Sequence, residues 1–308
     1  MNSIKFNQII TKVKTFYNHE LTTLCSREVV LDDLYQASMD VNDQLTDTVH
    51  IKMQIFDSDF PGDGTHGSYA LNTRNYLNAI SENLELFKRP LNITFACSIY
   101  DVPSEVNVTG LEKILNNDNV KRVFFLDYEN TIDDKKVYHW PIAIDWESAH
   151  LLKHMYKCNV LNQQKKSLTV YCDSHLSERY ITYGNDRQQV YDKLYNTDVC
   201  NDHIYFLDHR RPLHVVHANY SKHAFVVSPH GFGLDCYRTW EALLCGAIVI
   251  VKTSAQDRLY GGLPVVIVDD WSECLDKRNL RRWYDQLHQL TKPKYMWEKL
   301  TYNNWLNQ

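Results

Sequence analysis

The stretch Ser228–Val251, SPHGFGLDCYRTWEALLCGAIVIV, decides the fold of this chain. Its first residues end an apolar run that predicts a buried strand, and a turn containing Gly231 and Gly233 follows. A helix is expected next, with Asp235 as its N-cap and Gly246 at its end, before the apolar strand AIVIV. A strand, a turn, a helix and a second strand in this order form the repeating unit of a parallel α/β sheet.

The same alternation extends outward in both directions. Short apolar runs separated by helical patterns are typical of a parallel sheet covered by helices on both faces. We therefore predict an α/β protein with two Rossmann-like lobes, residues 1–155 and 156–290, and a last helix, residues 291–308, that crosses back to the first lobe. The first fifty residues read as mixed helix and loop. The other expected strands are Val49–Phe56, Pro90–Tyr100, Lys121–Glu129, Ser167–Asp173, His203–Asp208 and Leu263–Asp270, and further helices are expected at Pro212–Lys222 and Arg278–Leu290.

Composition excludes several classes of protein. The chain has 308 residues, with 33 Lys and Arg against 38 Asp and Glu, so its formal charge is −5. This balance argues against a nucleic-acid partner bound on a basic face. Apolar runs are strand-length and the first twenty residues are too polar for a signal peptide, so we expect no membrane span and a cytoplasmic location. The eight Cys contain no CxxC pair, which predicts free thiols and no zinc site.

The glycine turn is a candidate anion site. It places a helix N-terminus at the carboxyl edge of the sheet, where N–H groups and the helix dipole favour a negative charge. Gly231 and Gly233 also let the backbone approach a phosphate closely. Arg238 and Glu241 share one helix face, so Arg238 can hold phosphate oxygens while Glu241 accepts from two ribose hydroxyls. The alternatives are an ordinary strand-to-helix turn and an intrahelical Arg238–Glu241 ion pair.

The stretch from Ser228, with the later segment LYGGLPVVIVDDW, resembles the C-terminal lobe of exostosin-like glycosyltransferases with the GT-B fold. The resemblance covers about the last 140 residues. It implies that the glycine turn and an Arg bind the donor diphosphate, that the Glu of EALxxG binds the donor ribose, and that the segment after the next strand lies near the donor sugar or base. The residues so implied are His230, Gly231, Phe232, Gly233, Arg238, Glu241, Thr253, Ser254 and Asp257.

The resemblance also implies contacts at the first strand end of this lobe. Members of the family often place a phosphate-binding Arg or Ser there, and the segment YCDSHLSERY offers Ser174 and Arg179. A helix start exposed to solvent is the alternative for this segment.

The substrates follow from the family in the same way. We expect a nucleotide-sugar donor, a UDP-sugar with UDP-xylose preferred, and a hydroxyl group of a glycan as acceptor. Cellular members are anchored in membranes by an N-terminal hydrophobic segment that this sequence lacks, which favours an enzyme of the cytosol encoded by a microbe or a virus.

Transfer with inversion needs a base on the acceptor hydroxyl and positive charge or dipoles on the departing diphosphate. The glycine-rich loop after the strand ending at Phe56 offers Asp57, Asp59, Asp63 and His66. We expect one of these carboxylates to be the base, with Asp59 preferred. An acidic loop exposed to solvent is the alternative.

Two other functions remain open. Asp57 and Asp59 form an Asp-x-Asp after an apolar strand, the arrangement by which another class of glycosyltransferases holds Mn²⁺ or Mg²⁺ against the diphosphate. Outside that alternative we expect no metal and no cofactor. The third possibility is a non-catalytic protein that binds a nucleotide or a glycan, and turnover of the donor distinguishes it from both enzymes.

Overall fold

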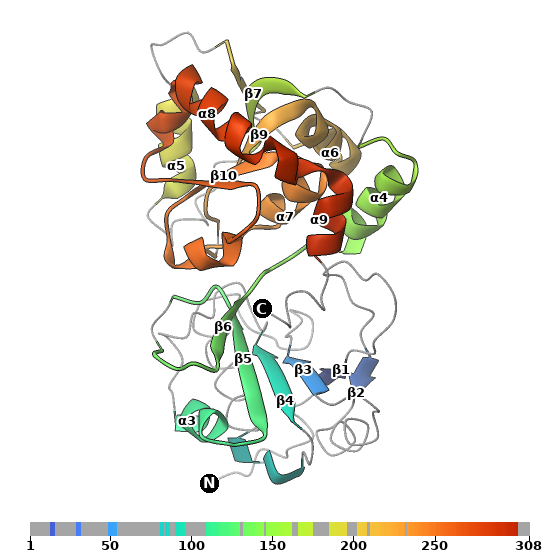
Figure 1. The fold of residues 1–308 in the computed structure, drawn as a ribbon, viewed down its shortest axis with the longest axis vertical. Helices are drawn as coiled ribbons and strands as arrows, with labels where there is room; N and C mark the ends of the chain where they lie inside the picture. Colours follow the sequence, from blue (N-terminus) through green and yellow to red (C-terminus); the bar gives the residue numbers. More distant parts are fainter. Residues whose placement is uncertain are drawn as a thin grey trace. The chain divides into compact units, whose positions relative to one another are not determined.

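The computed structural model of the chain divides into two compact units, one up to Ile142 and one from Ala143 onward (Figure 1). The predicted boundary after residue 155 falls inside the helix α4 (Trp146–Lys157). Ala143 is buried and has φ 68°, a left-handed conformation that is rare outside glycine. The structure describes residues 13–15, 29–31, 49–53, 81–82, 84–86, 90–95, 109–129, 132–144, 146–161, 166–174, 185–195, 202–207, 210–231 and 233–300.

The first unit is built on a mixed sheet with the strand order β2-β1-β3-β4-β5-β6. The strands β3 to β6 pair in parallel, whereas β1 is antiparallel to both β2 and β3. The helix α3 (Thr109–Leu115) joins β4 to β5 and packs on β5. The strands are β1 (Val13–Thr15), β2 (Val29–Leu31), β3 (Val49–Met53), β4 (Leu91–Phe95), β5 (Val120–Leu126) and β6 (Val137–Trp140).

The expectation of mixed helix and loop over the first fifty residues is wrong where the structure describes them. The segments β1 and β2 are strands of three residues each. A run of three residues is too short to show the alternation that identifies a strand in sequence.

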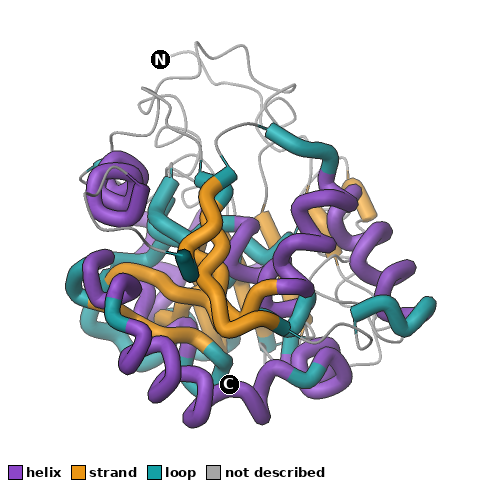
Figure 2. Tube along the Cα trace, turned by 90° about the horizontal axis from the view of Figure 1, so that it is seen from above, coloured by secondary structure: helices purple, strands orange, loops and turns teal. Residues whose placement is uncertain are grey.

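The second unit has a parallel sheet with the order β11-β10-β9-β7-β8, and Figure 2 shows its helices gathered around the strands. The predicted α/β class with two Rossmann-like lobes is confirmed. The strands are β7 (Ser167–Cys172), β8 (Ile204–Phe206), β9 (His223–Val227), β10 (Ile248–Lys252) and β11 (Val265–Val268). The longer helices are α4, α6 (Leu213–Lys222), α7 (Tyr237–Leu244), α8 (Lys277–Leu287) and α9 (Pro293–Lys299). The shorter helical segments are α5 (Asp186–Val190), η5 (Tyr191–Tyr195), η6 (Ala255–Tyr260), η7 (Trp271–Leu275) and η8 (His288–Thr291).

Alternate residues of these strands are buried on opposite faces of the sheet. Phe225, Val227 and Ile250 belong to a core with residues of α5, η5, η7 and α8. Tyr171 and Val226 point the other way, where α6 and α7 contact the sheet. Because both faces are covered at the central strands β9 and β10, these strands are mostly apolar, which is why the sequence identifies them as runs rather than as alternating patterns.

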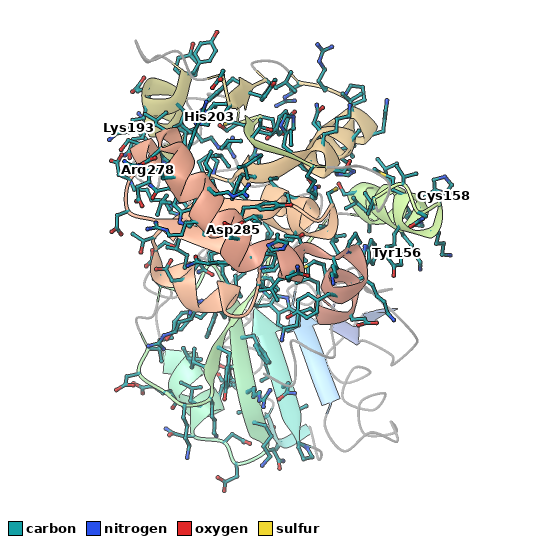
Figure 3. All side chains as sticks on the ribbon, turned by 45° about the horizontal axis from the view of Figure 1, so that its top comes forward. Tyr156, Cys158, Lys193, His203, Arg278 and Asp285 are labelled. Carbon is teal, nitrogen blue, oxygen red and sulfur yellow. The ribbon has the colours of Figure 1, made fainter. Side chains whose placement is uncertain are left out.

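The helix α9 packs on α7 within the second unit. Its Trp297 stacks on Tyr156 of α4, with 5.1 Å between the ring centroids. Figure 3 labels Tyr156. Trp305, at the far end of the predicted last helix, lies outside the described residues.

A partly buried lysine holds together the amino edge of the second sheet. Lys166 directly precedes β7, and burial lowers its pKa to about 8, an effect that the nearby Cys245 opposes. Its ammonium Nζ donates to backbone carbonyls at the ends of α6 and α7 and at the start of β9. These are the carbonyls of Tyr220 (3.0 Å), Ser221 (2.9 Å), His223 (3.4 Å) and Cys245 (3.2 Å).

Gly246 ends α7 as predicted, with φ 75°. A Cβ at this position would also lie 2.8 Å from the carbonyl oxygen of Thr291. Gly246→Ala is therefore expected to lower the free energy of unfolding by about 3 kcal/mol, since backbone strain and a clash with backbone add together. Gly262 is the matched control, because its φ is 73° and a Cβ there meets nothing within 4 Å. Gly262→Ala should cost only about 1 kcal/mol in urea unfolding, and equal losses in the two variants would contradict the packing argument.

His223 makes the second unit sensitive to acid. Its Nδ1 lies 2.7 Å from the hydroxyl of Thr169, and burial, together with Lys166 and Lys222, lowers its pKa to about 4. The unfolded chain takes up this proton near pH 6.5 and the folded protein only near pH 4, so stability falls as the pH drops through that window. We expect His223→Gln to lose less stability than the wild type between pH 7 and pH 5 in urea unfolding.

The control for this comparison is His214→Gln, because His214 is exposed on α6. It should keep the acid sensitivity of the wild type. A His223→Gln variant that is as acid-sensitive as the wild type would contradict the assignment.

Candidate functional site

The second sheet reverses its strand order between β7 and β9. From β7 the chain first adds β8 on one side, and then returns to place β9 on the other side. Ligands of open α/β sheets bind in the crevice outside the carboxyl ends of the two strands at such a switch point. Asp173 and Ser174 follow β7 there, and the turn that begins at Ser228 follows β9.

The glycine turn lies at this edge, as the sequence predicts. The N–H of Gly231 donates to the carbonyl of Gly233 at 3.0 Å, and the Cys236 thiol donates to the carbonyl of Pro229 at 3.3 Å. A Cβ on Gly231 would lie 2.7 Å from Nη2 of Arg187. A larger residue at this position would displace the end of the Arg187 side chain, and Phe232 lies outside the described residues.

The helix α7 begins as predicted, but the expectation that Asp235 is its N-cap is wrong. The N-cap is Cys236, which makes no side-chain hydrogen bond to the helix backbone. The Asp235 carboxylate accepts from the indole Nε1 of Trp240, at 2.9 Å to each oxygen, and from the N–H of Cys236. Trp240 is fully buried, whereas Tyr237 is 44% exposed.

Arg238 pairs with an acidic residue of the neighbouring strand end. Its Nε donates to Oδ1 of Asp173 at 2.5 Å, and Oδ2 of Asp173 accepts from the Tyr220 hydroxyl at 2.9 Å. Burial raises the pKa of Tyr220 well above its usual value, and Asp173 raises it further. The side chain of Arg238 retains 14% exposure. An anionic ligand must therefore share Arg238 with Asp173.

Glu241 lies one turn further along α7 and is buried. Its Oε1 accepts from the hydroxyl of Ser148 on α4 at 2.5 Å, and its Oε2 lies 3.7 Å from Nε2 of His217 on α6. Arg238 and Glu241 thus each have a partner on another element, rather than only each other as in the intrahelical alternative. Because each carboxylate oxygen can accept two hydrogen bonds, Glu241 keeps acceptor capacity beyond the bond from Ser148.

The segment after β10 contains the three residues that the resemblance places near the sugar or the base. Ser254 caps η6 by accepting from the N–H of Gln256 at 3.1 Å, and the Asp257 carboxylate accepts from the N–H of Ser254 at 2.9 Å. The Thr253 hydroxyl donates to the same carboxylate at 2.7 Å. Thr253, Ser254 and Asp257 are therefore brought together in a capping box.

The end of β7 contains Ser174, whose buried hydroxyl lies 3.2 Å from the thiol of Cys172. Burial raises the pKa of this thiol to about 11, so it stays protonated at neutral pH. Arg179, the other residue expected here, lies outside the described residues. So do the candidate base and metal residues Asp57, Asp59, Asp63 and His66.

Two further side chains at this edge, Asp186 and Lys252, have no signal in the sequence. Asp186 opens α5 and accepts from the N–H of His230 at 3.0 Å, and Nζ of Lys252 lies 3.8 Å from it. Burial lowers the pKa of His230, an effect that Asp186 opposes. Within the described part of the chain, no group of three His, Cys, Asp or Glu could hold a metal ion. In the same part, no helix combines the length and the apolar character needed to cross a bilayer.

The comparisons with known proteins give structural matches alone. No family model matches the chain. No curated protein sequence matches it. Among solved structures it is similar to a UDP-forming α,α-trehalose-phosphate synthase from Burkholderia vietnamiensis, at 10% identity and a TM-score of 0.43, over 89% of this chain and 72% of that one.

Two other solved structures are similar to a lesser degree. A UDP-forming α,α-trehalose-phosphate synthase from Burkholderia xenovorans has 11% identity and a TM-score of 0.39, over 89% of this chain and 76% of that one. An α-glucosyltransferase in complex with UDP and a 13-mer DNA has 12% identity and a TM-score of 0.34, over 90% of this chain and 79% of that one. With every TM-score below 0.5, these similarities carry no argument about activity. The chain is an α/β protein of two Rossmann-like units, and its second unit has a polar, partly cationic edge at the switch point of its sheet.

Proposed function

We propose that the chain is a glycosyltransferase that binds a nucleotide-sugar donor at the switch point of the second unit. The observation that carries the proposal is the convergence of a glycine turn with three cations at one sheet edge. Arg187 contacts the turn, Lys252 lies 3.8 Å from the carboxylate that accepts from the turn, and Arg238 follows the turn on α7. A diphosphate is an anion of matching charge, which backbone N–H groups and guanidinium groups bind well.

The site has the chemistry that the departure of a nucleoside diphosphate needs. Negative charge develops on the leaving diphosphate in the transition state, and N–H groups and cations fixed at that place lower the barrier without metal. Glu241 can hold the donor ribose, because a carboxylate accepts from two vicinal hydroxyls. The resemblance of the segment that begins at Ser228 to exostosin-like glycosyltransferases supports the same assignment.

The finer parts of the proposal come from that resemblance. The donor is a UDP-sugar, with UDP-xylose preferred, and the acceptor is a hydroxyl group of a glycan. Transfer proceeds with inversion and without a metal, in a GT-B fold whose first lobe supplies the base. The base is one of Asp57, Asp59, Asp63 and His66, with Asp59 preferred.

The experiment is a thermal-shift and calorimetric screen of the purified protein against UDP, GDP, CMP and a panel of UDP-sugars, each with EDTA and with Mn²⁺. A ligand that binds only the folded state stabilises it by RT ln(1 + [L]/Kd). UDP binding that survives EDTA, together with slow hydrolysis of one UDP-sugar, supports the proposal.

Other outcomes of the screen support a different function or remove the proposal. Binding that needs Mn²⁺ and is lost in Asp57→Asn or Asp59→Asn supports the metal-dependent alternative. Nucleotide binding without transfer and without donor hydrolysis indicates a non-catalytic binder. Absence of binding to every nucleotide would remove the proposal.

A further inference from the structure

Two consecutive residues of α5 bind the two backbone polar groups of one residue of the glycine turn, His230. Asp186 accepts the N–H of His230 on its Oδ2 at 3.0 Å, and Nε of Arg187 donates to the carbonyl of the same residue at 3.2 Å. We propose that Asp186 and Arg187 are positioning residues that fix the turn starting at His230 for the phosphate end of the donor. This inference rests on the proposed function.

The Asp186 carboxylate contacts three segments besides its own helix α5: the glycine turn, η7 and the end of β10. Its side chain is 3% exposed, and its Oδ1 accepts from the indole Nε1 of Trp271 on η7 at 2.7 Å. The same Oδ1 lies 3.8 Å from Nζ of Lys252 at the end of β10. A buried carboxylate is costly unless hydrogen bonds and a cation compensate it. Here these partners come from η7, β10 and the turn, so the carboxylate fixes their mutual positions.

The Arg187 guanidinium lies close to the backbone of the turn at Gly231. Because a Cβ on Gly231 would lie 2.7 Å from Nη2 of Arg187, the guanidinium occupies the space that a side chain at that position would take. A guanidinium is a rigid fork, so fixing Nε on the carbonyl of His230 also fixes the direction of its other nitrogens. The turn and the guanidinium therefore keep one arrangement.

Lys252 belongs to the same assembly. Its Nζ donates to Oε1 of Gln189 at 2.6 Å, and Gln189 follows Asp186 by three residues on α5. One turn of helix thus holds both the glycine turn and the lysine at the end of the next strand.

Charge and position predict opposite effects at Asp186. A carboxylate close to an anion site repels the ligand, so by charge alone Asp186→Asn would bind a diphosphate more tightly. If the carboxylate acts by holding the turn, the same variant binds more weakly, because an amide offers one acceptor where the carboxylate offers two. The sign of the change therefore separates the two.

The experiment measures the affinities of UDP by calorimetry and of uridine by NMR for the wild type, Asp186→Asn, Arg187→Met and Arg187→Lys. The matched control is Asp192→Asn, because Asp192 is exposed on η5 and its carboxylate accepts from Gln188, four residues earlier in the chain. We expect Asp186→Asn to weaken UDP binding about tenfold or more, with the affinity for uridine changed by less than about twofold.

Arg187→Met tests the other half of the clamp and does so even if Asp186→Asn fails to fold, since Arg187 is only partly buried. Arg187→Lys keeps the charge but lacks Nε, so we expect it to remain weakened. UDP affinity that is unchanged or tighter in Asp186→Asn, or full recovery in Arg187→Lys, would overturn the inference. Equal weakening of UDP and uridine would overturn it as well, because it indicates a general structural role. A wild type that binds no nucleotide removes the proposed function and the inference with it.

Discussion

Replacing Lys166 with methionine is expected to lower the free energy of unfolding by about 3 kcal/mol or more. The Nζ of Lys166 lies within 3.4 Å of four backbone carbonyls and shares its three N–H groups among them, whereas methionine keeps the length and the apolar stem of the side chain but offers no donor. Buried carbonyls that lose their donor cost about 1–3 kcal/mol each. Urea unfolding at pH 7 measures the loss.

The matched control is Lys222→Met, because Lys222 is an exposed lysine on the last turn of α6. It should change the stability by less than about 0.5 kcal/mol. A Lys166→Met variant that is as stable as this control would contradict the role of the buried ammonium.

The pH dependence of the stability gives a second test of the role of Lys166. The pKa of Lys166 is about 8 in the folded protein, below its usual 10.5. Between these values the unfolded chain holds the proton and the folded protein releases it, so stability rises with pH across this window. Lys166→Met should lack this rise. A rise of equal size in the variant would assign it to other groups.

Replacing Glu241 with glutamine is expected to lower kcat/KM for the donor by about 100-fold, or about 3 kcal/mol. The change keeps an oxygen that can accept from Ser148 and removes the charge that two ribose hydroxyls would share. The expected loss follows from two charge-assisted hydrogen bonds of about 1.5 kcal/mol each. Donor hydrolysis and transfer, assayed with the UDP-sugar that the binding screen selects, give the number.

The ribose itself provides the control for this prediction. The wild type should bind UDP more tightly than 2′-deoxy-UDP, and Glu241→Gln should bind the two about equally. Glu298→Gln, a change at an exposed position of α9, should keep the wild-type preference. A Glu241→Gln variant that still prefers ribose would place the sugar contact elsewhere.

Much of the second unit could be predicted from the sequence, because both faces of its sheet are covered. An apolar run such as AIVIV is compatible with few structures other than a buried strand. Gly246 identifies the end of the helix, because glycine readily adopts the left-handed φ of 75° found there. The glycine turn could be found for the same reason, since it follows a buried strand directly. These signals are local, and each is contained in a few consecutive residues.

The rest of the site depends on pairs that are far apart in the chain. Asp173 lies 65 residues before Arg238, and Asp186 lies 44 residues before His230. The sheet order brings these segments together, and nothing in their own composition indicates the partner. The error at Asp235 has a related cause. An Asp before a helix is usually a cap, but here Trp240 offers a buried indole N–H that must find an acceptor.

Ala143 follows Ile142, where the chain leaves the first unit, and its φ of 68° lies in the left-handed region. An alanine in the left-handed region costs about 1–2 kcal/mol that a glycine would not. A glycine at this position would adopt positive and negative φ about equally, whereas an alanine strongly prefers negative φ. The buried alanine therefore keeps a backbone conformation that costs free energy, and the packing around it must offset that cost.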